Sequence, residues 1–420
     1  AYVARVGEQV AQAAGVPGAC TFTVVNTDVV NAFAVPGCYI YVTRGLLTIM
    51  NNEAELASVL GHEVGHVVAD HSDRRSNAST LSGLGALILG VITESGQLAQ
   101  AAGQAAQAWT LGYSREQEYE SDDLGLRYLQ ASGYDPFALA GMLESLQEHD
   151  RLEALTRGRD AEAVPEWART HPLTEARVER AQARAREVGA TPGSLPLRQD
   201  EFLTALDGML YGDDPEQGFI DGRRFAHPKL LVAFEAPQGF SLTNSSQAVG
   251  IEGPAGVRAQ FSGGALQGSL EQHATAVLRQ LLGETPAQVG AVRRDTINGL
   301  AAVLIPARVQ TQSGVADVQV AAYDFGDGQA YHFIALGPAG RVGAATPLFN
   351  SLRRLSSSEA QALRPRRLEI RTVRAGDTPQ ALAERMAFDS YRLERFLMLN
   401  DLEAGEPLRA GQRVKLVVRG

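Results

Sequence analysis

One helical segment constrains this chain more than any other. In His62-Glu63-Val64-Gly65-His66 the two histidines are four residues apart, which places their side chains one turn apart on the same face of a helix. Asn52, followed by Glu55 three residues later, predicts where this helix begins. Two imidazoles at this spacing can converge on one tetrahedral zinc ion. Glu63 lies about 100° further round the helix, beside the open coordination position.

A zinc ion that takes part in catalysis needs a third protein ligand. A second helix is predicted to begin after Ser114, which forms a capping-box pair with Gln117. Glu118 and Asp122 are four residues apart and share a face of that helix, so we predict Glu118 as the third ligand and Asp122 as an outer carboxylate that orients a ligand histidine. The alternative is a solvated acidic face, because five acidic residues crowd this run: Glu116, Glu118, Glu120, Asp122 and Asp123.

Length and charge limit the classes of protein to which the chain can belong. It has 420 residues, of which 45% are hydrophobic, and this length suggests about three domains. A net charge of -10 argues against a nucleic-acid partner, since such binders present a basic face. No run approaches the roughly 20 apolar residues of a membrane-spanning helix. The chain begins with Ala1 and not with Met, so we expect a trimmed form from which any signal segment has been removed.

The pattern of the chain changes twice. Up to about residue 190 it is mainly helical, and from about 228 to 340 short strand-like runs alternate with turn signals around one amphipathic helix, 270–282. A charged linker then leads to a tail with a strand–helix–helix–strand pattern. We therefore predict a domain at 1–195, an α+β domain of unknown role at 196–360, and a small β-α-α-β domain at 366–420.

Two cysteines flank a predicted β-hairpin. If 21–26 and 32–41 pair as antiparallel strands, Cys20 lies opposite Cys38. A disulfide would then form in an oxidising compartment. Pro36 disturbs that register, so two buried thiols are an equal alternative.

The segment 79–111 is small, apolar and interrupted by glycines. It is interpreted either as a helical hairpin packed in the core, or as a flap over the site or a patch that makes peripheral contact with a membrane.

Four motifs within residues 1–190 resemble the zinc metallopeptidases that include the CAAX prenyl endopeptidases, HtpX and the BepA-like proteases. The motifs are 31–37 with 44–47, 53–66, 115–122 and 170–177. The resemblance implies a mainly α zincin fold of the gluzincin type with a small edge β-hairpin. It also implies one Zn²⁺ per chain on His62, His66 and Glu118, with Glu63 as general base and Asp122 as the supporting carboxylate.

The last motif contributes two further residues. By resemblance, His171 is a catalytic residue that either contacts the metal in a closed state or stabilises the oxyanion. From the sequence alone, a position before Pro172 suits a loop that reaches the site, or a capping or surface histidine. Arg177 is predicted to hold a carboxylate or a peptide carbonyl close to the site, or to be one of several solvated arginines.

These residues together predict an endopeptidase. We expect Asn31, Ala32, Phe33 and Ala34 to form an edge strand that binds the main chain of an extended polypeptide. Such binding favours unfolded or misassembled proteins as substrates, in quality control in the periplasm or at the outer membrane of a bacterium. The tail 366–420 resembles a LysM module, which implies peptidoglycan as a partner. The alternative function is a chaperone-like or peptidoglycan-tethered binding protein that retains the zinc fold but rarely cleaves.

Overall fold

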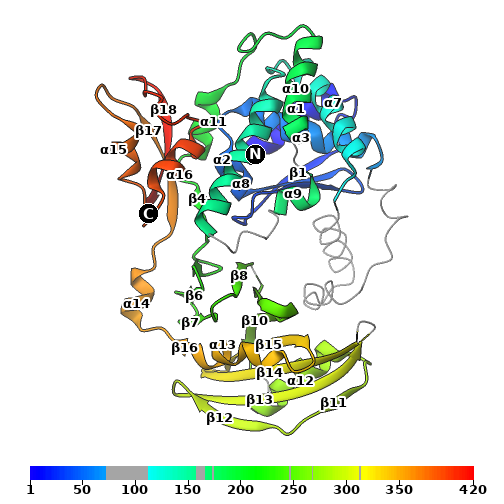
Figure 1. Ribbon diagram of the computed structural model, residues 1–420, viewed down its shortest axis with the longest axis vertical. Helices are drawn as coiled ribbons and strands as arrows, with labels where there is room; N and C mark the ends of the chain where they lie inside the picture. The colour runs from blue at the N-terminus through cyan, green and yellow to red at the C-terminus, as the bar shows by residue number, and fades with distance from the viewer. Residues whose placement is uncertain (72–111, 158–165, 173–174, 246, 267, 312–313) are drawn as a thin grey trace. The chain divides into compact units, whose positions relative to one another are not determined.

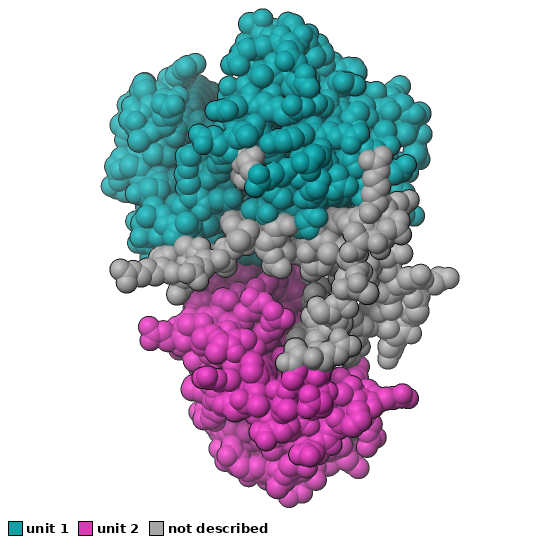
Figure 2. Space-filling view, turned by 45° about the vertical axis from the view of Figure 1, so that its right-hand side comes forward, with its two compact units in different colours: residues 1–82, 93–212, 366–420 teal, residues 83–92, 213–365 magenta. Residues whose placement is uncertain are grey.

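The computed structural model describes residues 1–420 except 72–111, 158–165, 173–174, 246, 267 and 312–313 (Figure 1). The described residues form two compact units (Figure 2). Unit 1 holds those of 1–212 together with the tail 366–420, and unit 2 holds 213–365. The tail thus groups with the N-terminal half of the chain, while the three predicted domain boundaries stay predictions.

Unit 1 is built around one buried helix, α3 (Glu53–Val68), which is buried from Glu53 to His66. It begins where predicted, because the Asn52 side chain accepts a hydrogen bond from the backbone N–H of Glu55 at 2.9 Å. The other elements before the tail are α1 (Tyr2–Ala13), β1 (Thr21–Val25), β2 (Ala32–Val35), β3 (Tyr39–Thr43), α2 (Arg44–Ile49), α7 (Arg115–Ala131), α8 (Ala138–Arg157), α9 (Glu166–Thr170), α10 (Glu175–Glu187), α11 (Gln199–Leu206) and β4 (Leu210–Tyr211).

The predicted hairpin is wrong in its pairing. β1 runs parallel to β3, β3 pairs antiparallel with β2, and the sheet order is β1-β3-β2. Cys20 and Cys38 nevertheless form a disulfide. They do so because they directly precede Thr21 and Tyr39, which are partners in the parallel pair. The hairpin therefore comprises β2 and β3, and the turn at 36–38 that joins them holds one of the two cysteines.

The tail has the predicted order of elements: β17 (Arg366–Thr372), α15 (Pro379–Ala383), α16 (Arg392–Leu399) and β18 (Arg413–Arg419). β17 lies between β18 and β4 in a three-stranded antiparallel sheet, so the tail shares a sheet with residues 210–211 (Figure 1). Its identity as a LysM module stays a prediction.

Lys415 of β18 attaches the tail to the region where the central helix begins. The side chain is fully buried, and its ammonium donates to the carbonyl oxygens of Thr48 at 3.0 Å and Met50 at 2.6 Å. Burial lowers the pKa of Lys415 to about 7 and raises that of Glu55 to about 7, and the opposite charge of each group counters the shift of the other. The tail is therefore part of the framework that holds α3.

We expect Lys415→Met to destabilise the protein by about 2–4 kcal/mol, because the apolar stem remains but two buried carbonyls lose their donor. The measurement is urea unfolding followed by circular dichroism. Lys229, the other lysine of the chain, is an exposed matched control, and Lys229→Met should leave the midpoint unchanged. Equal midpoints for both variants would contradict this role for Lys415.

Unit 2 contains a large antiparallel sheet with the order β11-β13-β14-β15-β10-β9-β8, and β12 also pairs with β13. Alternate residues of each strand face opposite sides, and each side has its own core. Val303 and Ile305 pack beneath α12, whereas Ala302 and Leu304 belong to the core that includes Phe349 of α13. The elements are β8 (Ser241–Asn244), β9 (Val249–Glu252), β10 (Arg258–Ala265), α12 (Leu270–Leu282), β11 (Ala287–Val289), β12 (Arg293–Ile297), β13 (Leu300–Thr311), β14 (Gly314–Gly326), β15 (Gln329–Pro338) and α13 (Thr346–Ser351).

A smaller sheet with the order β16-β7-β6-β5 completes unit 2, and α14 (Ser357–Ala362) follows it. Its strands are β5 (Phe219–Asp221), β6 (Arg224–His227), β7 (Val232–Glu235) and β16 (Arg353–Arg354). The α+β character predicted for this part of the chain is confirmed by these helices and sheets. None of the described helices combines the length and hydropathy needed to cross a bilayer. The segment 79–111 lies outside the described residues.

Candidate metal centre

Two glycines let the helices that carry the site approach closely. A Cβ atom added to Gly125 of α7 would lie 2.9 Å from the backbone nitrogen of His62, and one added to Gly65 of α3 would lie 3.1 Å from the carbonyl oxygen of Ser121. Because neither helix carries a side chain at these points of contact, a carboxylate from α7 can reach the histidines of α3. The two sequence segments predicted to form one site are thereby brought together.

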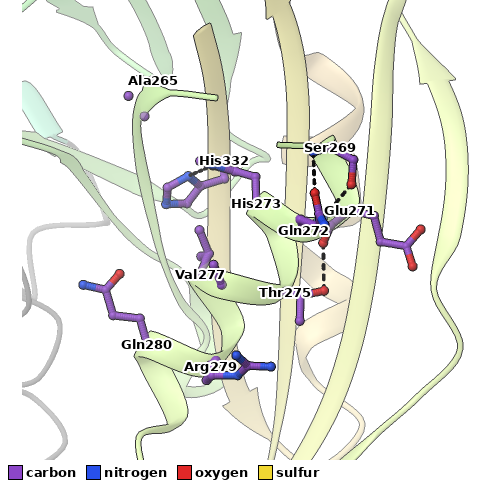
Figure 3. A pocket seen from close by; sticks show the side chains of 13 residues that line it. Ala265, Ser269, Glu271, Gln272, His273, Thr275, Val277, Arg279, Gln280 and His332 are labelled. Carbon is purple, nitrogen blue, oxygen red and sulfur yellow. Dashed lines mark hydrogen bonds between the residues drawn. The ribbon is translucent and has the colours of Figure 1, made fainter. Parts of the chain in front are cut away.

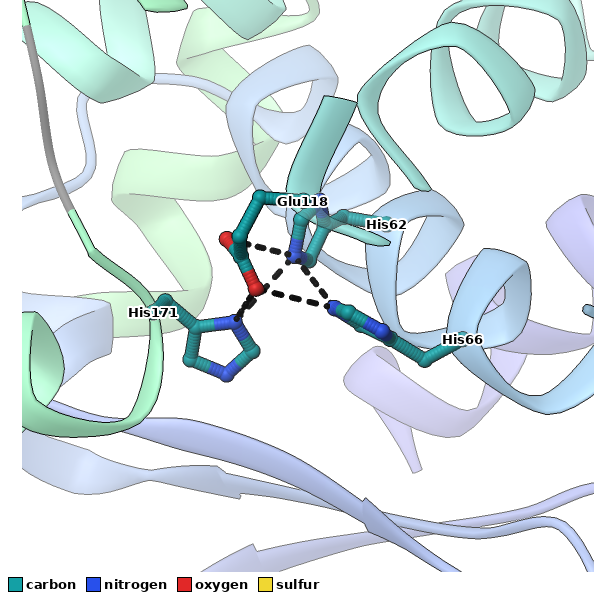
Figure 4. A group of neighbouring side chains, drawn as sticks. All are labelled: His62, His66, Glu118 and His171. Carbon is teal, nitrogen blue, oxygen red and sulfur yellow. Dashed lines mark hydrogen bonds and ion pairs between the residues drawn. The ribbon is translucent and has the colours of Figure 1, made fainter. Parts of the chain in front are cut away.

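Four side chains meet at this contact: His62, His66, Glu118 and His171 (Figure 4). One potential ligand atom from each lies within 4.8 Å of the others, and all four residues are buried. The His62 and His66 Nε2 atoms are 2.9 Å apart. Oxygens of Glu118 lie 3.6 Å from the first of these atoms and 3.3 Å from the second. Nitrogen and carboxylate donors converging in this way can hold a divalent transition-metal ion.

Asp122 and Arg177 form the outer layer on one side. The Asp122 carboxylate accepts from His62 Nδ1 at 2.9 Å, which directs the lone pair of His62 Nε2 into the cluster. Arg177 donates to both oxygens of Asp122 at 2.8 Å and contacts Glu118 at 2.6 Å. The solvated alternatives for Glu118, Asp122 and Arg177 are wrong, because all three side chains are buried.

This ion-pair network sets the charge of the site. Burial raises the pKa of Asp122, but the charge of Arg177 and the hydrogen bond to His62 outweigh it and lower the pKa to about 2. The pKa of Glu118 is well below its usual value, because the charges of His171 and Arg177 outweigh burial. Burial and the charge of His62 lower the pKa of His66. Ionised carboxylates beside a neutral His66 suit a bound cation.

Sequence reasoning missed the partner of His66. Asp70, just past the end of α3, has a φ of 52°, a left-handed conformation that reverses the chain. His71 is thereby placed with its Nδ1 atom 2.9 Å from His66 Nδ1 and its Nε2 atom 3.2 Å from Glu120. The spacing of five residues after His66 was the available signal, but the direction of the turn decides the contact.

Glu63 and His171 face each other across the cluster. Glu63 is fully buried, and one of its carboxylate oxygens lies 3.5 Å from His171 Nε2. The other ring nitrogen of His171 lies 3.1 Å from Glu118 and 3.2 Å from His62. His171 follows α9 directly and stacks on Trp167 with ring centroids 4.5 Å apart. Its side chain is fully buried, so it is not a surface histidine, and it fills the fourth side of the cluster.

The predicted substrate-binding residues lie beside this group. Ala32, Phe33 and Ala34 belong to β2, and their side chains are buried. Among the described strands, β2 lies at one edge of its sheet and pairs only with β3. The Asn31 side-chain oxygen accepts from the hydroxyl of Thr170, next to His171, at 3.3 Å. The fold thus links the start of β2 to the residue that precedes His171.

Two helical histidines with a glutamate between them, and a carboxylate from a second helix, are the donor set of metal-dependent hydrolases. Comparison with known proteins agrees: residues 1–185 match the model of peptidase family M48. The chain is 31% identical to a protein named protease HtpX homolog from Pyrococcus abyssi, over 43% of this chain and 73% of that protein. It is 32% identical to the beta-barrel assembly-enhancing protease of Escherichia coli, over 40% of this chain and 34% of that protein.

A further relative is the mitochondrial metalloendopeptidase OMA1 of Arabidopsis thaliana, 33% identical over 36% of this chain and 28% of that protein. The chain belongs to peptidase family M48. It spans about a third of the length of the Escherichia coli relative.

Proposed function

We propose that this chain is a zinc-dependent endopeptidase. The observation that carries the proposal is the buried convergence of His62, His66 and Glu118 beside Glu63. The three ligand residues would hold Zn²⁺, which when bound polarises the scissile carbonyl and makes water more acidic. Glu63 would accept the proton of the attacking water and return it to the leaving amine. Asp122 and Arg177 would keep His62 and Glu118 in position.

The substrate is proposed to bind as an added strand along β2. Backbone pairing of this kind depends little on side chains, which suits unfolded or misassembled polypeptides. The Cys20–Cys38 disulfide supports an oxidising compartment, and one relative is named for β-barrel assembly. We therefore propose the bacterial envelope as the location, in the periplasm or at the outer membrane, with protein quality control as the role.

Removal of the metal tests the proposal. We expect the purified chain to hold at least one zinc ion and to cleave casein. Treatment with 1,10-phenanthroline should abolish cleavage, and returned Zn²⁺ should restore it. Metal content by mass spectrometry and release of fluorescent peptides are the measurements. Cleavage that persists in the metal-free protein would contradict the assignment.

The position of His171 supports a second candidate, a low-activity or chaperone-like protein. Its imidazole is fully buried and lies against both Glu118 and His62, where a substrate carbonyl would have to enter. We expect His171→Ala to raise casein cleavage about tenfold, a change of about 1.4 kcal/mol in the barrier. His149→Ala, which removes a histidine outside the cluster, serves as the control. A fall of about 100-fold would instead assign His171 to stabilising the oxyanion.

The tail supports a third candidate, a protein tethered to peptidoglycan. Its strand–helix–helix–strand order is the one expected of the LysM module that the tail resembles. Deleting 366–420 would also remove Lys415 from its buried contacts with the carbonyls of Thr48 and Met50, so a truncated chain is a poor test. Retention of the full chain on insoluble peptidoglycan, with release by soluble chitooligosaccharide, is the suitable measurement, and retention that the oligosaccharide does not change would contradict this role.

A further inference from the structure

Unit 2 contains a cavity that the proposed peptidase function does not use. It has a volume of about 730 Å³ and lies where α12 packs against the strands β10 and β15 (Figure 3). His273 of α12 and His332 of β15 both line it. Gly263 and Gly264 of β10 line it as well, and a Cβ added to Gly264 would meet no atom within 4 Å, so this wall is open. Both histidines are partly buried.

The two imidazoles face each other at a distance that suits a shared metal ion. His273 Nε2 lies 3.3 Å from His332 Nδ1. Two nitrogens bound to one tetrahedral ion at 2.0–2.1 Å are separated by about 3.3 Å. The rings therefore need almost no rearrangement to act as two adjacent ligands.

A third residue orients one of the rings. Ser262 and His332 are directly paired on the adjacent antiparallel strands β10 and β15. The Ser262 hydroxyl lies 3.0 Å from His332 Nε2. When that nitrogen carries the proton and donates it to Ser262, the lone pair of His332 Nδ1 points towards His273. Outer-layer hydrogen bonds of this kind fix the tautomer of metal-binding histidines.

The charge state of the two histidines favours a metal cation over an anion as the ligand of the cavity. Burial, with the charge of His273 adding to it, lowers the pKa of His332 to about 4, and burial also lowers the pKa of His273. Neutral imidazoles offer no positive charge to an anion but do offer lone pairs to a metal.

We propose that His273 and His332 bind a divalent transition-metal ion, such as Zn²⁺, in the cavity of unit 2. The ion would keep two positions open to the cavity, for water or a small donor ligand. This site is independent of the peptidase centre, since it shares no residue with that centre. The proposal does not depend on whether the chain cleaves peptides.

Counting bound zinc tests the proposal on the full-length chain. After equilibrium dialysis against micromolar Zn²⁺ with the peptidase centre already loaded, we expect one zinc ion more per chain in the wild type than in His273→Ala or His332→Ala. Titration calorimetry should show binding of that additional ion at least tenfold weaker in each variant. Ser262→Ala keeps both ligands and should weaken binding by about 10- to 100-fold. His149→Ala is the matched control and should keep the additional ion.

Two outcomes would overturn the proposal. The first is an equal zinc count in the wild type and in both histidine variants. The second is labelling of Ser262 by a fluorophosphonate probe, which would assign the three residues to nucleophilic chemistry. Thermal unfolding identifies any variant that does not fold, and Ser262→Ala, which removes only a hydroxyl, then decides the matter. Loss of the zinc ion from the peptidase centre alone would leave the additional ion in place, so failure of the proposed function and failure of this inference are distinguishable.

Discussion

Glu63→Gln should reduce kcat/KM for casein by about 100- to 10,000-fold while the zinc content stays equal to that of the wild type. The amide has almost the same shape as the carboxylate but cannot accept a proton from water. Glu63 is fully buried beside His62 and His66 and faces His171 Nε2 at 3.5 Å. The measurements are steady-state cleavage of a fluorescent casein and metal content of the same sample.

A matched control separates loss of the base from loss of a charge. Glu179 of α10 is exposed, and Glu179→Gln should leave kcat/KM unchanged. If Glu63→Gln retained cleavage within a few-fold of the wild type, with zinc bound, the assignment of Glu63 as general base would be wrong. If the variant lost both its zinc and its activity, Glu63 would be needed to hold the metal site together. That result would contradict proton transfer as its main role.

Arg177→Met should destabilise the metal-free protein by about 3–5 kcal/mol, because it leaves two buried carboxylates without their counter-charge. The guanidinium is buried and contacts Asp122 and Glu118 at 2.6–2.8 Å. Methionine fills most of the space of the side chain but brings no charge. Urea unfolding monitored by circular dichroism gives the free energy of unfolding.

The metal state gives this prediction a second test. A bound cation supplies positive charge to Glu118, so the loss of stability should be smaller in the zinc-loaded protein than in the metal-free protein. Arg186→Met, an exposed change on the same helix α10, should have little effect in either state. A loss below about 1 kcal/mol for Arg177→Met in the metal-free protein would contradict the ion-pair account.

Local spacing determined much of the candidate centre. A turn of helix places His62 and His66 on one face whatever surrounds them, and the capping residues Asn52 and Ser114 begin their helices where the sequence predicted. Glu118 could be predicted as a partner because four-residue spacing also relates it to Asp122. The sequence could support these inferences because each depends on contacts within one helix.

Contacts between distant segments could not be read in this way. The antiparallel register predicted for Cys20 and Cys38 was wrong, because β1 pairs in parallel with β3, and strand pairing depends on the whole sheet and not on the intervening turn. The contact of His71 with His66 depends on a left-handed residue at Asp70. The contact between His273 and His332 could not be predicted from spacing, because the two residues lie 59 positions apart in the sequence.

The sequence by itself determined the helices, the metal-binding residue types and the order of elements in the tail, since periodicity and capping are local properties. Only the tertiary structure decided that His171 closes the cluster, that Arg177 is buried between two carboxylates, and that Lys415 joins the tail to the start of α3. In each case a charged or polar side chain is buried, and such burial is favourable only where packing brings the partner that compensates it.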